Sequence, residues 1–136
     1  MQTVHGDGYS YEAPTTWVVV HKGTSSAASD GAVNRLEVST FTLEKAYRAA
    51  LFDAVAKELD TAAAGLAAQL KGKVVSGSTI EVDGRKARSY TIDYGGKTEQ
   101  IVFVLEDKTE YELLCRRATS ASSSTCDQLF SSFAVG

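Results

Sequence analysis

The spacing of apolar and polar residues divides the chain into three regions. Up to residue 42, apolar residues alternate with polar ones or form short β-branched runs, which favours strands. Between residues 44 and 70 they recur every three or four positions, the spacing of one helical face. After residue 72 the alternation returns. The pattern therefore predicts strands, then one long helix, then a second group of strands.

Three strands are expected in the first region. A short aromatic strand ends before the only proline, Pro14. Two longer strands occupy residues 17–22 and 35–41, and the second alternates so that one of its faces is wet. Residues 23–31 between them are small and polar, which predicts a mobile loop. The glycine-containing residues 1–8 predict a loose leader.

The long helix is expected between Glu44 and Leu70. Its apolar face is formed by Tyr47, Leu51, Val55, Leu59, Ala62, Leu66 and Leu70. Dense alanine and the absence of proline favour helix throughout this segment. Thr42 is the expected N-cap, Gly72 the expected C-cap, and Gly65 a position where the helix could bend. A helix of this length would measure about 40 Å.

Four antiparallel strands joined by tight turns are expected after the helix. They cover residues 73–82, 85–94, 97–105 and 109–117. Asp83-Gly84 and Gly95-Gly96 are two-residue hairpin signals, and residues 106–108 supply the third turn. A Ser-rich loop at 118–125 then leads to a short helix. One face of that helix would carry Cys126, Leu129, Phe130 and Phe133.

This order of elements predicts the fold class. Helices that are segregated from an antiparallel sheet define the α+β class. We expect a twisted antiparallel sheet with the long helix packed on one face and a short C-terminal helix. A chain of 136 residues suits one domain, spanning residues 1–136. The hydrophobic share of 43% and charged share of 23% are typical of soluble globular domains.

Charge and hydropathy argue against two kinds of partner. The net charge of −3 leaves no basic footprint, so a nucleic-acid partner is not expected. No stretch approaches the roughly 20 apolar residues of a membrane span, so no transmembrane segment is expected.

The two cysteines, Cys115 and Cys126, have two interpretations. They could form a disulfide, since no other cysteine competes for either, or they could be buried free thiols. A bridge closing so short a loop would add about 2–3 kcal/mol of stability and would indicate an oxidising compartment. Residues 1–7 have neither the basic start nor the apolar core of a signal peptide. We therefore expect a secreted or envelope-anchored protein whose leader is absent from this chain.

Residues suited to catalysis or metal binding are few. The only histidines are His5 and His21, and no serine lies in a nucleophile elbow, so no catalytic residue is predicted. His5, Asp7 and His21 could hold a divalent metal if the N-terminal strands were adjacent, but nothing fixes their geometry. The glycines at 6–8 precede a strand rather than a helix, which argues against a phosphate loop. The sequence predicts neither a metal site nor a cofactor.

A small basic cluster follows the first turn of the strand meander. It consists of Arg85, Lys86 and Arg88. These residues could form a surface for an anion or an acidic partner, or their charges could protect an edge strand from aggregation. Arg116 and Arg117 would extend the cluster if their strands were neighbours.

Two segments resemble a known family. Residues 9–17, YSYEAPTTW, resemble the aromatic-strand and Pro-x-x-Trp start of the PsbP-like and Mog1-like fold. Residues 126–133, CDQLFSSF, look like the closing helix of its bacterial members, which are mostly small secreted proteins or envelope lipoproteins. The order of elements is similar too. The resemblance implies a Mog1/PsbP-like sandwich that binds partners and catalyses no reaction.

Three functions follow from these observations. The first is a non-enzymatic binding or assembly module of the cell envelope, with a protein partner on the sheet surface that the helix leaves uncovered. A lipid anchor outside this chain would be compatible with it. The second is a cytoplasmic partner-binding protein or secretion-effector chaperone on the same fold. The third is a metal-dependent enzyme that uses His5, Asp7 and His21. The sequence names no ligand and no oligomeric state.

Overall fold

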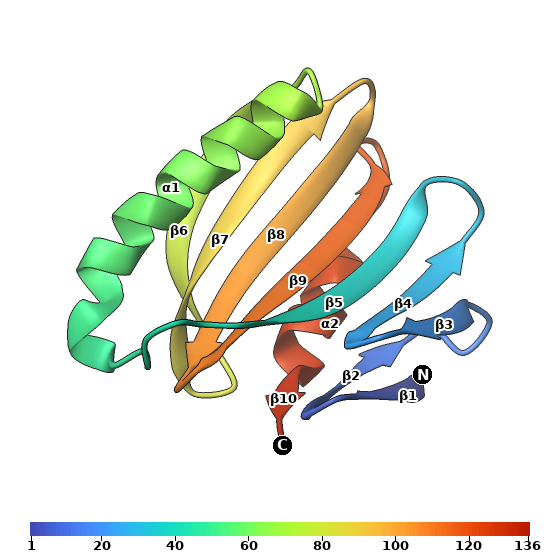
Figure 1. Ribbon diagram of the computed structural model, residues 1–136. Coiled ribbons are helices and arrows are strands. Elements are labelled where there is room, and N and C mark those ends of the chain that lie inside the picture. The colour runs from blue at the N-terminus through green and yellow to red at the C-terminus, as the bar shows by residue number, and fades with distance from the viewer.

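A computed structural model describes residues 1–136 and has the expected order of strands, long helix, strands and short helix (Figure 1). The N-terminal strands are β1 (Gln2–Gly6), β2 (Tyr9–Ala13), β3 (Val18–Lys22), β4 (Ser25–Asp30) and β5 (Asn34–Thr42). The later strands are β6 (Lys73–Val82), β7 (Arg85–Tyr94), β8 (Lys97–Glu106), β9 (Thr109–Ala118) and β10 (Ala134–Val135). The helices are the 3-10 turn η1 (Ala49–Leu51), α1 (Phe52–Gln69) and α2 (Ser124–Ser132).

The strands form two sheets. The large sheet has seven antiparallel strands in the order β3-β4-β5-β9-β8-β7-β6, and the small sheet has the order β1-β2-β10. The four-strand meander β6–β9 confirms the sequence prediction. β5 pairs with β9, which joins the N-terminal strands to the meander. Helix α1 lies on one face of the large sheet, whereas α2 and the small sheet lie on the other (Figure 1).

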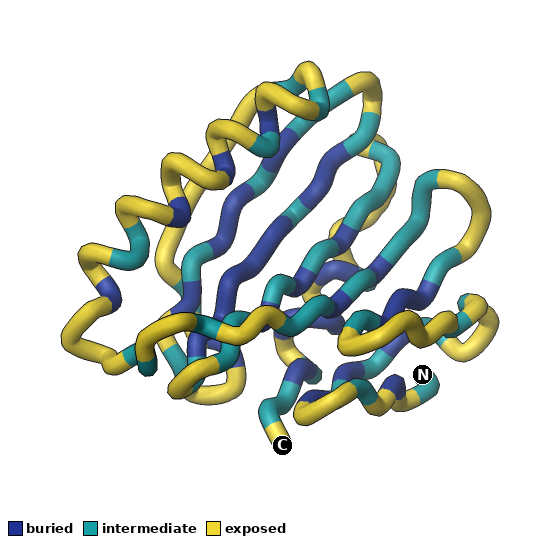
Figure 2. The backbone as a smooth tube through the Cα atoms, viewed as in Figure 1, coloured by how far each residue is buried: buried dark blue, intermediate teal, exposed yellow.

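Each face of the large sheet contributes to its own hydrophobic core. Successive side chains of a strand point to opposite faces. In β8, Ile101 and Phe103 therefore pack beneath α1, while Val102 and Val104 join the core formed with α2 and the small sheet. The core on the α2 side contains 18 buried residues and the core on the α1 side only eight, so the α1 side is the less covered one. Figure 2 shows buried residues concentrated along the inner strands β7 and β8.

The long helix begins later than the sequence pattern predicts. It starts at Phe52, after η1, and Thr42 is the last residue of β5 rather than an N-cap. The backbone N–H groups of Leu43 and Tyr47 donate to the carbonyls of Lys108 and Asp107, at 2.7 and 2.6 Å. The apolar periodicity persists in this segment because Leu43 and Tyr47 still pack against the core beneath α1.

The helix ends near the expected place by a different device. Lys71, not Gly72, adopts the left-handed conformation, with φ of 57°. The N–H of Gly72 donates to the carbonyl of Ala67, which completes a Schellman-type end. A Cβ atom at Gly72 would lie 2.4 Å from the carbonyl oxygen of Asp93, so glycine is required for close approach to β7. Helix α1 continues through Gly65.

Two N-terminal expectations are wrong. Residues 1–8 are not a loose leader, because β1 pairs with β2 along its length and Val4 is only 2% exposed. Residues 23–31 are not a mobile loop, because Ser25–Asp30 form β4 between β3 and β5. Ser26 and Ala28 of β4 are buried on the α2 side, where the Ser26 hydroxyl hydrogen-bonds with that of Tyr9, and small residues of this kind have a weak strand signal.

The turns of the meander behave as expected. Asp83 and Gly84 have φ of 49° and 75°, and Gly95 and Gly96 have φ of 54° and 78°. Positive φ at both central residues defines the two-residue turn that matches the twist of a hairpin. No helix of the protein combines the length and apolar character needed to span a membrane.

Candidate functional site

Part of the large sheet is left uncovered on the α1 side. Helix α1 packs on β6, β7 and β8, while β9, β5, β4 and β3 extend beyond it (Figure 1). Along β5 and β9, buried residues of the α2-side core alternate with residues on the α1 side. We call the latter the open face: Glu37, Ser39 and Phe41 of β5 with Glu110, Glu112 and Leu114 of β9.

The strand register sets the pairs across this face. Glu112 lies opposite Ser39, and Glu110 lies opposite Phe41. On its other side, Glu112 lies opposite Phe103 of β8, which is buried beneath α1. The two carboxyl groups therefore lie between the apolar core beneath α1 on one side and β5 on the other.

A hollow of about 510 Å³ continues the open face toward the helix. It lies between α1, the segment at 43–47 and the adjoining part of β8 and β9. Its apolar lining includes Leu43, Val55, Leu59 and Leu105, and its charged lining consists of Glu44, Lys45, Glu58 and Glu110. We call the hollow together with Glu112 the acidic groove.

The carboxyl groups of the groove lack cationic partners. None of the five ion pairs in the protein includes Glu110 or Glu112. Burial raises the pKa of Glu110. Burial, followed by repulsion from Glu110 and Glu37, raises the pKa of Glu112 to about 7. Glu37 differs because Arg35 lies 3.1 Å away and forms an ion pair with it.

This environment can accept a positive charge. A carboxylate whose charged form is disfavoured by burial and like charges gains most when a cation approaches. Two exposed apolar side chains on the α1 side of the sheet add contact area. They are Phe41, which is 49% exposed, and Val20 of β3, which is 58% exposed. The open face thus offers carboxylates and apolar side chains together.

The basic residues singled out from the sequence make contacts within the protein. Arg85 forms ion pairs with Asp83 and Glu106, and Arg88 forms one with Asp60 of α1. Lys86 lies over the ring of Phe52 at 5.5 Å. Two of the three cations are therefore already paired within the protein. Their strand, β7, lies between β6 and β8, so it is not the edge strand that the alternative interpretation required.

Arg116 and Arg117 do not extend this cluster. Arg116 lies opposite Glu99 in the register, near one end of β8, whereas Arg85 pairs with Glu106 at the other end. The strands β7 and β9 are also separated by β8. Arg116 instead donates to the carbonyl of Val33, at 2.9 Å.

The three residues considered for a metal site do not form a ligand cluster. His5 is in β1 of the small sheet, Asp7 is in the turn after it, and His21 is in β3 of the large sheet. No three His, Cys, Asp or Glu side chains in the protein gather closely enough to hold a metal ion.

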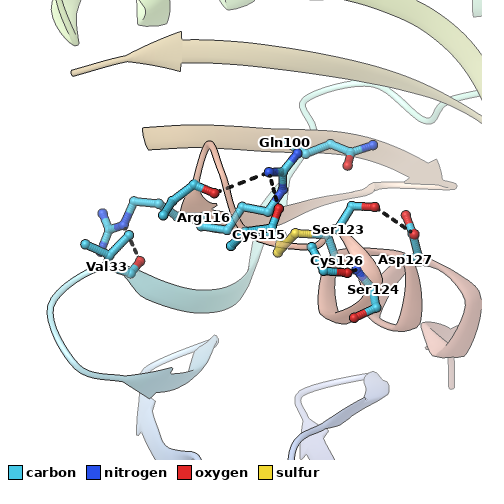
Figure 3. Close-up of a disulfide and its surroundings, with 12 residues drawn as sticks. Val33, Gln100, Cys115, Arg116, Ser123, Ser124, Cys126 and Asp127 are labelled. Carbon is cyan, nitrogen blue, oxygen red and sulfur yellow. Dashed lines mark hydrogen bonds between the residues drawn. A yellow bond between two sulfur atoms is a disulfide. The ribbon is translucent and has the colours of Figure 1, made fainter. Parts of the chain in front are cut away.

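The disulfide between Cys115 and Cys126 is present (Figure 3). It joins β9, a central strand of the large sheet, to the first turn of α2, and both cysteines are buried in the α2-side core. The Cα atoms are 5.5 Å apart, within the usual range for a bridge. The interpretation as a disulfide is confirmed, and there are no free cysteines.

One polar contact that positions the groove was missed by sequence reasoning. Asp60 of α1 accepts hydrogen bonds from the Tyr90 hydroxyl and from Arg88, the latter at 2.8 Å. Both hydrogen bonds lower the pKa of Asp60, and the one from Tyr90 has the larger effect. They tie the middle of α1 to β7 and so help to fix the helical wall of the groove. Asp60 is one of several polar residues on the helix, so its spacing alone gave no signal.

Comparison with known proteins supports the fold and no more. No family model and no curated protein matches the sequence. A solved crystal structure from Bacteroides thetaiotaomicron VPI-5482 resembles the chain with a TM-score of 0.60 and 12% sequence identity. The match covers 95% of this chain and 45% of the other, so this chain spans less than half the length of that neighbour. At this identity the likeness shows a shared α+β fold alone.

Proposed function

We propose that the protein is a non-enzymatic binding or assembly module of the cell envelope, and that a protein partner binds on its open face. The observation that carries the proposal is the uncovered half of the sheet on the α1 side. There, apolar side chains and unpaired carboxyl groups are presented together. A monomeric protein rarely leaves such an area accessible unless it is used for binding.

The open face offers a partner a rigid binding surface. β5 and β9 are inner strands of the seven-stranded sheet and are paired on both sides. Their backbones are therefore fixed before any partner arrives, which lowers the entropic cost of association. The disulfide fixes β9 further through its link to α2.

The disulfide also supports the compartment. Disulfides persist in oxidising environments such as the periplasm and the extracellular space, and are rare in the cytosol. The buried Cys115–Cys126 bridge is compatible with such a location. The resemblance of residues 9–17 and 126–133 to envelope members of the PsbP-like and Mog1-like family points the same way.

A selection experiment tests the proposed surface. Peptides from an unbiased displayed library are selected on the folded protein and mapped by amide chemical-shift changes. We expect the largest changes along β5 and β9, at Ser39, Glu112 and Leu114. Ser39→Arg should abolish binding by filling the face, whereas Ser131→Arg, at an exposed position of α2, should not. Selected peptides that map away from the open face, or a library that yields no binder, would refute the proposal.

A further inference from the structure

We infer that the occupant of the acidic groove is a cationic amphipathic polypeptide segment, with apolar side chains in the hollow and Lys or Arg side chains at the carboxylates. This inference rests on the proposed function, because it names the chemistry of the partner that the open face would bind.

The hollow requires an apolar component. Leu43, Val55, Leu59 and Leu105 contribute to its lining. Its volume of about 510 Å³ falls within the range of about 300–1,000 Å³ found for specific ligand pockets. Burying apolar side chains of the partner against these residues would contribute to the affinity by removing apolar surface from water.

The rim requires a positive component. Three carboxylates and a single ammonium group line the hollow, and Glu112 adds a further carboxyl group two residues beyond Glu110 on the same side of β9. None of Glu44, Glu58, Glu110 and Glu112 is engaged in an ion pair. A partner that brings cations would satisfy these groups, and a partner that brings anions would be repelled.

A second copy of the chain is a poorer occupant. Pairing two open faces about a two-fold axis would bring the groove carboxylates of both copies together, because such an interface uses the same patch twice. The net charge of −3 on each copy adds to the repulsion. The charge pattern therefore selects a partner of opposite sign.

Binding of a cation at Glu112 should be linked to proton release. Glu112 faces Glu110 on its own strand, Glu37 with its partner Arg35 on β5, and the apolar Phe103 on β8. The nearby wall of α1 contributes Glu58 to the groove. Since the pKa of Glu112 is raised to about 7, its carboxyl group is largely protonated at pH 6 and largely ionised at pH 8. Affinity for a cationic segment should therefore rise roughly five- to tenfold between these pH values.

Three matched synthetic helical peptides test the inference. All carry leucines at helical spacing, and their remaining positions are Lys, Glu or Gln. Titration calorimetry at 0.15 M salt should show binding of the Lys peptide, weaker binding of the Gln peptide and none of the Glu peptide. Glu112→Gln should lower the affinity for the Lys peptide at pH 8 at least fivefold and remove its pH dependence. Glu81→Gln, at an exposed carboxylate of β6 outside the groove, should leave both unchanged.

The outcomes separate this inference from the proposed function. Equal binding of the three peptides, or an unchanged pH dependence in Glu112→Gln, would overturn the cationic occupant. The open face would still stand if library peptides mapped to it by chemical shift. A concentration-dependent dimer in sedimentation that Ser39→Arg dissolves would assign the face to a second copy and would also overturn the inference.

Discussion

Replacing Glu112 with glutamine should make the protein more stable at alkaline pH. The substitution keeps the size of the side chain and removes its charge. Burial, with repulsion from Glu110 and Glu37, raises the pKa of Glu112 from 4.5 to about 7. Each pKa unit is worth about 1.4 kcal/mol, so the rise corresponds to at most roughly 3–4 kcal/mol. Partial contact of this side chain with solvent reduces the expected effect to about 2 kcal/mol.

The sign follows from proton linkage. Between its unfolded and folded pKa values, the folded state holds a proton on Glu112 that the unfolded state has lost. Stability that is present below pH 4.5 is therefore lost as the pH rises toward and through 7. The native protein should lose about 2 kcal/mol from this group between pH 4.5 and 8. Glu112→Gln should not show this loss.

Urea unfolding at a series of pH values measures the effect. The free energies of unfolding of the native protein and of Glu112→Gln should agree near pH 4.5 and differ by about 2 kcal/mol at pH 8. Glu81→Gln serves as the control, because Glu81 is exposed and its substitution should leave the pH profile unchanged. Parallel profiles for the native protein and Glu112→Gln would refute the claim that Glu112 is buried among like charges.

Three further predictions address the framework of the groove. Cys126→Ser should lower the free energy of unfolding by about 2–3 kcal/mol in urea titrations, and a loss below about 0.5 kcal/mol would contradict a structural role for the bridge. Gly72→Ala should lower the unfolding temperature by several degrees, because its Cβ would press on the carbonyl of Asp93; an unchanged temperature would contradict this close approach. Asp60→Asn should cost under about 1 kcal/mol, since the ion pair with Arg88 is partly exposed, but should increase hydrogen exchange within α1. Unchanged exchange in α1 would show that this contact does not hold the helix.

The elements that local chemistry determines were predictable from the sequence. The meander follows from alternation and from turn residues that tolerate positive φ, as at Asp83-Gly84 and Gly95-Gly96. The pairing of Cys115 with Cys126 followed from the absence of competitors, although the sequence left free thiols open. In each case the signal lies within a few residues of the element it specifies, so no knowledge of the packing is needed.

Other elements depend on contacts between distant segments. The start of α1 is displaced because residues 43–47 are held by carbonyls of the β8–β9 turn, while their apolar spacing remains helical. Strand β4 was missed because its residues are small, and small residues have a weak strand signal. Its side chains on the α2 side pack in the core beside the small sheet. The carboxylates of the groove alternate with Tyr111 and Leu113, which indicates a strand with a wet face. This face forms a partly enclosed groove because α1 covers only part of the sheet. No local sequence pattern specifies how far that cover extends.

The most direct test of the open face as a binding site for cations is proton release on binding. Calorimetric titration of the Lys peptide at pH 7, in two buffers of different ionisation enthalpy, gives the number of protons exchanged. With the pKa of Glu112 at about 7, about half a proton should be released for each peptide bound, and none in Glu112→Gln. Binding of the Lys peptide without proton release, or with the same release in the variant, would contradict the account.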